Sequence, residues 1–152
     1  MQNTRKTGAE QYYTPIEIAT YCIKILDKIA TADTYLEPAG GTGAFLHALT
    51  GRTVVSYDIE PKANNILQVD SFLNVDLTHL SNVITVTNPP FGRNHSLSIP
   101  FFNHAADCSD YIAFIIPKSW RKWTVINRLD QRFHLVHDED LTVDYLYLDQ
   151  RK

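Results

Sequence analysis

VITVTNPPF, at residues 83–91, joins a run of β-branched residues to two consecutive prolines. Proline has no N–H for a strand ladder and holds φ at about −65°, so the pattern predicts a buried strand over 83–87 that ends at Asn88. In an open α/β sheet, ligands bind beyond the carboxyl ends of the strands. The amide of Asn88, the rigid Pro89 and Pro90, and the ring of Phe91 are therefore expected in a ligand-binding position.

This group of residues suits the recognition of an exocyclic amine. The nitrogen of adenine, cytosine or glutamine is a poor nucleophile because its lone pair is delocalised. Two acceptors, the side-chain oxygen of Asn88 and the carbonyl oxygen of Pro89, would take both N–H protons and favour a pyramidal nitrogen. Phe91 would then stack on a base that has been rotated out of its helix. The alternative is a plain end of a strand.

A glycine-rich stretch, EPAGGTGAF at 37–45, follows a predicted strand over 34–36 and precedes a predicted helix over 44–49. Strand, glycine turn and helix form the nucleotide-binding start of a doubly wound sheet. The third glycine of a dinucleotide fingerprint is absent, and no Lys-Ser/Thr pair follows as in a P-loop. The stretch therefore indicates a nucleotide-like cofactor of another kind.

Two further predicted strands, over 53–57 and 66–69, each end beside an aspartate. Asp58 is placed to accept both hydroxyls of a cofactor ribose. Asp70 would accept from an adenine amine, with the Phe72 ring against the base. The alternatives are a turn-forming Asp58, a loop Asp70 and a core Phe72.

The rest of the chain continues the alternation of strands and helices. Apolar spacing predicts a helix over about 15–29, with Thr14 as its N-cap and Pro15 at its first position. Further predicted elements are helices over 98–106 and 124–131, a strand over 111–116, and candidate strands over 133–137 and 143–148. The pattern predicts a three-layer, doubly wound α/β fold with a mainly parallel, Rossmann-like sheet.

The 152 residues predict a single domain over 1–152, with no separate target-recognition domain. No apolar run approaches the ~20 residues needed to span a bilayer, and the polar start lacks a signal core, so a cytoplasmic or similarly reducing location is expected. Cys22 and Cys108 match no metal-ligand or redox spacing. We therefore expect two reduced, buried thiols and no metal.

The net charge of −3 argues against a generally basic nucleic-acid-binding protein, but the charges are unevenly distributed. Cations gather between 93 and 132, whereas 138–149 is acidic. The stretch KSWRKW at 118–123 combines cations with two indoles, which suits phosphate pairing and base stacking. Its alternative is a capping loop with inward-packed Trp side chains. The predicted nucleic-acid contacts are Phe91, Arg93, Lys118, Trp120, Arg121 and Lys122.

With these features in order, the sequence resembles the class I S-adenosylmethionine-dependent amino-methyltransferases of the N6-adenine type. EPAGGTGAF at 37–45 matches their methyl-donor motif, and NPPF at 88–91 matches their catalytic motif. QYYTP at 11–15 is similar to the segment that precedes the donor motif in the γ-type order and closes over the cofactor. The resemblance implies transfer of the sulfonium methyl group directly to adenine N6, without a covalent enzyme intermediate.

The resemblance also implies roles for individual residues. Asn88 and Pro89 would hold the amine, Pro90 and Phe91 complete the catalytic motif, and Phe91 stacks on the target base. Glu37, where the family more often has Asp, would lie near the donor's amino group. The residues expected to bind S-adenosylmethionine are Tyr13, Thr14, Pro15, Glu37, Pro38, Ala39, Gly41, Gly43, Phe45, Asp58, Asp70, Phe72 and Asn88.

Family members that modify DNA usually carry a target-recognition region, for which this chain has little room. A homodimer partner or another subunit is therefore a possible source of target recognition. The favoured function is methylation of adenine N6 in DNA. The alternatives are adenosine in RNA, glutamine in a protein, and a non-catalytic, donor-binding subunit of a methyltransferase complex.

Overall fold

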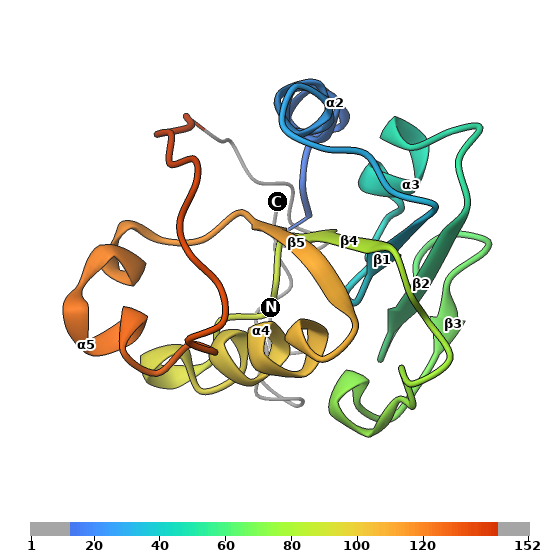
Figure 1. Cartoon of the computed structure of the whole chain (residues 1–152). Helices are drawn as coiled ribbons and strands as arrows, with labels where there is room; N and C mark the ends of the chain where they lie inside the picture. Colours follow the sequence, from blue (N-terminus) through green and yellow to red (C-terminus); the bar gives the residue numbers. More distant parts are fainter. Residues whose placement is uncertain (1–12, 143–152) are drawn as a thin grey trace, which may run out of the picture.

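The computed structural model describes residues 13–142. These residues form a five-stranded sheet in the order β3-β2-β1-β4-β5, in which every pair of neighbours is parallel (Figure 1). The strands are β1 (Thr34–Glu37), β2 (Val54–Asp58), β3 (Leu67–Gln68), β4 (Val83–Thr87) and β5 (Ser109–Phe114). The predicted α/β class with a doubly wound, Rossmann-like sheet is confirmed.

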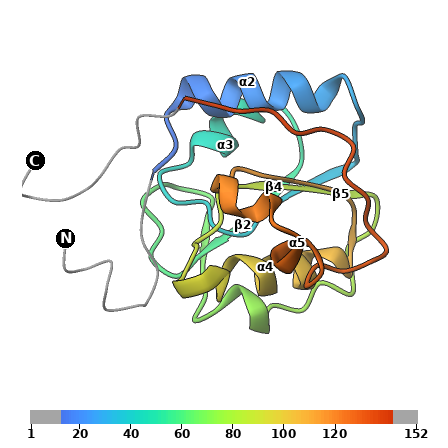
Figure 2. The same ribbon diagram turned by 90° about the vertical axis from the view of Figure 1, so that its left-hand side faces the viewer.

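Helices cover both faces of this sheet. Figure 2 shows α2 (Ile16–Asp27) and α3 (Ala44–Ala48) on one face and α4 (Ser98–Ala106) on the other. Short 3₁₀ turns and one further short helix complete the described chain: η1 (Phe72–Asn74), η2 (Arg93–His95), η3 (Lys118–Arg121) and α5 (Trp123–Ile126). Within residues 13–142, no helix is long and apolar enough to cross a membrane.

Two hydrophobic clusters separate cleanly across the sheet because successive strand side chains point to opposite faces. Tyr35 of β1 and Ile84 of β4 pack with α2 and α3, whereas their neighbours Leu36 and Val83 pack on the other side. β4 is buried at all five positions. Such continuous burial is typical of a central parallel strand and explains the apolar run before Asn88.

Several boundaries differ from those predicted. α2 begins at Ile16, and its N-cap is Pro15, without any side-chain capping bond, so the prediction of Thr14 as N-cap is wrong. β5 runs over Ser109–Phe114 instead of 111–116, and α5 has four residues instead of the predicted eight over 124–131. The free thiols of Cys22 and Cys108 are half-buried, not fully buried as expected.

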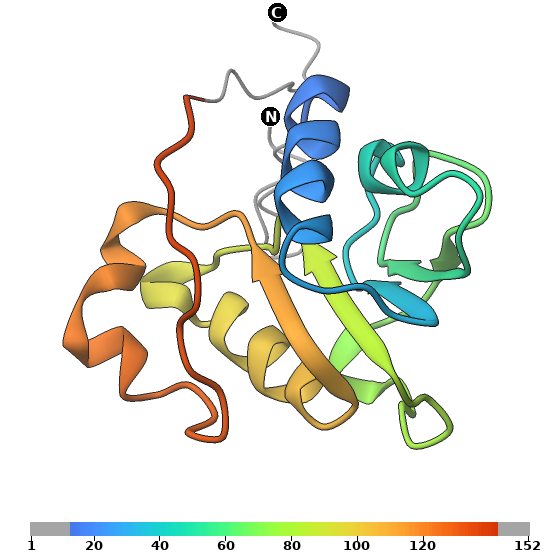
Figure 3. The same ribbon diagram turned by 45° about the horizontal axis from the view of Figure 1, so that its top comes forward.

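The candidate strand over 133–137 is also wrong, because residues 133–142 form no strand. This segment runs from the end of the α5 region past β5 toward α2 (Figure 3). Side-chain contacts hold it: Tyr21 of α2 donates to Glu139, and Leu141 packs against the cluster under α2. Leu135 and Val136 are mostly exposed. The candidate strand over 143–148 lies outside the described residues.

Phe72 provides a test of this packing. Its ring is 1% exposed and contacts Phe101 and His104. We expect Phe72→Ala to lower the free energy of unfolding by about 3–5 kcal/mol, because it leaves a large cavity in the core. The control Leu73→Ala, at the half-exposed neighbouring position, should cost about 1 kcal/mol or less. Urea denaturation measures both, and equal losses would contradict the core position of Phe72.

Candidate functional site

The strand order places a crevice between β1 and β4. After β3 the chain crosses back over β1, so the strand order reverses at this point, which is where open α/β sheets bind ligands. Glu37 ends β1, Asp58 ends β2, and Asn88 follows the last residue of β4. The structure therefore brings three predicted site residues to one edge of the sheet, as the spacing of the strands suggested.

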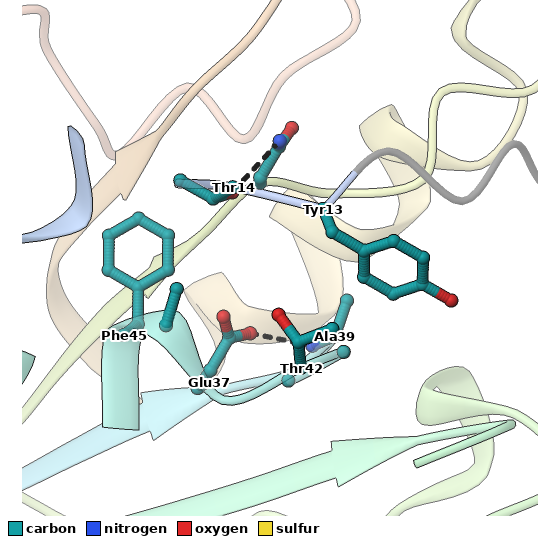
Figure 4. Close-up of a pocket in the computed structure, with 10 residues that line it drawn as sticks. Tyr13, Thr14, Glu37, Ala39, Thr42 and Phe45 are labelled. Carbon is teal, nitrogen blue, oxygen red and sulfur yellow. Dashed lines mark hydrogen bonds between the residues drawn. The ribbon is translucent and has the colours of Figure 1, made fainter. Parts of the chain in front are cut away.

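A pocket opens at this edge and encloses about 250 Å³, including the solvent at its mouth. Figure 4 shows Glu37 pointing into the space between Phe45 and the chain at Thr14, with Tyr13 at the side. The residues that line the pocket are Tyr13, Thr14, Glu37, Ala39, Gly40, Gly41, Thr42, Ala44, Phe45 and Asn88. Seven of these ten are among the residues predicted to bind the cofactor.

The glycine loop is shaped by close contacts on both sides. A Cβ on Gly40 would lie 2.4 Å from Ser56 Oγ, so only glycine fits there. Gly41 has φ of +56°, and its N–H donates to Asp58 Oδ2 at 2.7 Å. The other Asp58 oxygen accepts from the N–H of Glu60 at 2.8 Å. Asp58 therefore fixes the loop, and each of its oxygens keeps a lone pair for a further donor.

Glu37 is a carboxyl group buried in the pocket, and no cationic side chain of residues 13–142 pairs with it. It is 1% exposed, and its Oε1 accepts from the N–H of Ala39 at 2.7 Å. Burial raises the pKa of Glu37 to about 8. The hydrogen bond from Ala39 favours the charged form and so acts in the opposite direction. The buried Thr87 hydroxyl also favours the charge but makes no hydrogen bond of standard geometry. In its ionised form, this carboxyl would pair with a cationic group of a ligand.

Thr14 connects the N-terminal segment to the predicted catalytic motif. Its Oγ1 accepts from Asn88 Nδ2 at 3.1 Å, across 74 residues of sequence. The neighbouring Tyr13 packs its ring beside Gly41, at 3.1 Å from the position of a Cβ there. The two residues thus contact the side-chain amide of Asn88 and the glycine loop. The Thr14 hydroxyl, which was expected to cap α2, instead accepts this hydrogen bond from Asn88.

The remaining predicted cofactor residues lie outside the pocket lining. Pro15, Pro38 and Gly43 flank lining residues in the sequence and do not line the pocket themselves. Asp70 follows β3 and is exposed. Phe72 is packed in the core and has no free ring face for an adenine base. Sequence reasoning omitted Gly40, Thr42 and Ala44, although their place inside the glycine-rich stretch could have indicated them.

The catalytic motif continues into a turn that contacts η3. Pro89 is buried, and Pro90 and Phe91 are half-buried. In η2, His95 Nε2 lies 3.1 Å from Ser119 Oγ of η3, and burial lowers the pKa of His95 below its usual value. The loop after Asn88 and the basic stretch after β5 are therefore neighbours.

Within that basic stretch the side chains differ in accessibility. Trp120 is 5% exposed, and its indole N–H donates to Ser98 Oγ, so the inward-packed alternative holds for this residue. Trp123 is 73% exposed. Arg93, Lys118 and Lys122 are exposed.

Arg121 is also exposed, but it is already paired. Its guanidinium bonds both carboxylate oxygens of Asp138, at 2.9 and 2.6 Å, and one oxygen of Asp140 at 2.6 Å. Lys118 Nζ lies 4.0 Å from the other Asp140 oxygen. The acidic segment therefore neutralises part of the basic surface.

Comparison with known proteins found no match: no protein-family model fits the chain, and no curated protein or solved structure is significantly similar.

The raised pKa of Glu37 predicts a dependence of stability on pH. Between its ordinary pKa of 4.5 and about 8, the folded protein keeps a proton that the unfolded chain has lost. Stability therefore falls as pH rises through this range. We expect Glu37→Gln, which keeps the shape without the charge, to be increasingly more stable than wild type from pH 5 to 8.5.

Thermal unfolding of the two proteins across this range measures the effect. Glu17→Gln, at an exposed position on α2, is the control and should follow the wild type. A constant difference between Glu37→Gln and wild type at all pH values would contradict a neutral buried carboxyl.

Proposed function

We propose that this protein is an S-adenosylmethionine-dependent methyltransferase that modifies the N6 amine of adenine in DNA. The observation that carries the proposal is a single pocket, at the reversal of strand order, lined by both Glu37 and Asn88. Glu37 provides a carboxyl group that would bind a cation, and Asn88 provides the side-chain amide of the Asn-Pro-Pro-Phe motif. A methyl donor bound at Glu37 and an amine acceptor bound at Asn88 would thus be neighbours in the same pocket.

The residues present fit the amino-acid end of this donor. Glu37 would lose its proton and bind the donor's ammonium group, so that the charge it gains in the pocket is paired with a cation. Gly40 and Gly41 let the backbone approach the ligand closely. Asp58 has lone pairs that would accept hydrogen bonds from the ribose hydroxyls. The exposed Asp70 would accept from the adenine amine. When bound, the donor supplies an electrophilic methyl group on sulfur.

Asn88 and Pro89 would carry the acceptor chemistry. The Asn88 Oδ1 and the Pro89 carbonyl would accept the two N–H groups of the adenine amine, so that its lone pair is directed at the methyl group. Phe91, the next aromatic residue, would stack on the base after it leaves the helix. The amine loses its proton to water after the transfer.

A surface for nucleic acid lies beside this motif. Arg93 follows Asn-Pro-Pro-Phe directly, and η2 contacts η3 through His95 and Ser119. Exposed Lys118, Lys122 and Trp123 therefore belong to the same region as the acceptor motif. We assign base stacking there to Trp123 in place of buried Trp120. Lys and Arg would bind phosphates through charge.

The proposed activity is tested with methyl-labelled donor on double-stranded DNA, single-stranded DNA and RNA. Mass spectrometry should detect N6-methyladenine in DNA. Asn88→Ala should keep donor affinity in calorimetry but lower turnover by about 100-fold or more, because it removes a preorganised acceptor. Asn74→Ala, at an exposed position in η1, is the control.

Absence of N6-methyladenine in any DNA at saturating donor would overturn the DNA assignment, and product in RNA alone would favour the RNA alternative. Loss of donor binding in Asn88→Ala would assign that residue to the cofactor instead.

Trp123 provides a separate test of the nucleic-acid surface. A stacked aromatic residue is worth roughly 1–3 kcal/mol per base, so Trp123→Ala should weaken binding of a fluorescent single-stranded oligonucleotide by about tenfold. Ile126→Ala, an exposed apolar residue on the same helix, should bind like wild type. Fluorescence anisotropy measures both, and equal affinities for wild type and Trp123→Ala would remove Trp123 from the interface.

A further inference from the structure

The side-chain amide of Asn88 must adopt one of two orientations for the proposed chemistry. Its oxygen accepts hydrogen bonds and its nitrogen donates them, and the terminal torsion of asparagine is broad and roughly two-fold. Only the orientation with Oδ1 toward the acceptor can bind an amine through its N–H groups. The reverse orientation would place two donors against each other.

Thr14, 74 residues earlier in the sequence, contacts this amide. Thr14 Oγ1 accepts from Asn88 Nδ2 at 3.1 Å, and both residues line the pocket (Figure 4). Within residues 13–142, the Asn88 side chain forms no other hydrogen bond. The contact therefore binds the nitrogen end of the amide and leaves Oδ1 for the ligand.

The position of the Thr14 hydroxyl is fixed by its surroundings. Thr14 is 7% exposed, and its β-branched side chain has few rotamers. On one side, α2 begins at once, with the N–H groups of Ile18 and Ala19 donating to the Pro15 carbonyl. On the other side, the Tyr13 ring packs beside Gly41. The hydroxyl is thus held before any substrate arrives.

We propose that Thr14 is a positioning residue that holds the Asn88 amide with Oδ1 directed at the acceptor amine. It acts through Asn88 and not on the reacting atoms. The inference rests on the proposed function, since it specifies how the acceptor site of that function is preorganised. It gives the residue before α2 a role in turnover that is separable from donor binding.

Three variants test the proposal. Thr14→Val keeps the shape and removes the hydroxyl, Thr14→Ser keeps the hydroxyl, and Thr20→Val is the matched control at an exposed position on α2. Thr14→Val should lower kcat by about 10- to 100-fold, as expected for loss of orientation at the reacting group. The KM for the oligonucleotide and the donor Kd should change less than about twofold, because binding contacts remain.

Rescue by serine separates positioning from packing. Thr14→Ser should restore kcat to within about threefold of wild type, because the hydroxyl is retained while a methyl group is lost. If Thr14→Val turns over like wild type, the positioning role is overturned while the proposed function stands. If Thr14→Val mainly loses donor affinity, Thr14 is a cofactor contact instead. If wild type methylates neither DNA nor RNA, the proposed function itself fails and the role in turnover falls with it.

A measurement on the resting protein tests the contact without activity. The side-chain NH₂ signals of Asn88 are assigned by their loss in Asn88→Asp. In wild type and Thr14→Ser, one proton of the pair should show slowed solvent exchange, and in Thr14→Val this protection should disappear. Equal exchange in all three proteins would show that Thr14 does not hold the amide, and would overturn the inference.

Discussion

The parallel pairing of β1 with β4 is the contact on which the site depends. Leu36 pairs with Thr85 in the ladder, so the two strands end together and place Glu37 and Asn88 at one edge. The crossover from β3 back to β4 leaves a crevice at that edge. A shift of one residue in this register would turn β4's buried side chains to the opposite faces. The burial of β4 therefore also fixes the position of the site.

Two polar groups are held in the pocket at a cost to the fold. Glu37 is a carboxyl removed from water, and within residues 13–142 it has one backbone donor of good geometry, the N–H of Ala39. Burial raises its pKa, which reflects the cost of placing a charge there. Asn88 is held by the hydroxyl of Thr14, 74 residues earlier in the sequence. Such groups are rare in cores unless a ligand uses them.

Charge on the surface beside the site is arranged in opposing segments. The basic stretch after β5 lies next to the turn after Asn-Pro-Pro-Phe, while Asp138 and Asp140 pair with Arg121 of that stretch. All three groups are exposed, so their attraction is screened by salt. A polyanion approaching this surface would compete with the protein's own carboxylates. The net charge of −3 is therefore the sum of a basic surface around residues 118–123 and an acidic segment that contains Asp138 and Asp140, together with the charges of the rest of the chain.

The sequence by itself determined the class of fold and most of the pocket. Burial on both faces requires a continuous apolar strand, and glycines and prolines restrict the backbone locally, so 83–87 and the stretch over 37–45 were predictable. Tertiary structure decided what local pattern cannot encode. Phe72 and Trp120 became core residues because side chains of the distant helix α4 cover them. Residues 133–137 pair with no strand, and Leu135 and Val136 remain mostly exposed. Thr14 had a local reason to cap α2, but its hydroxyl instead accepts from Asn88, because only the folded sheet brings these distant residues together.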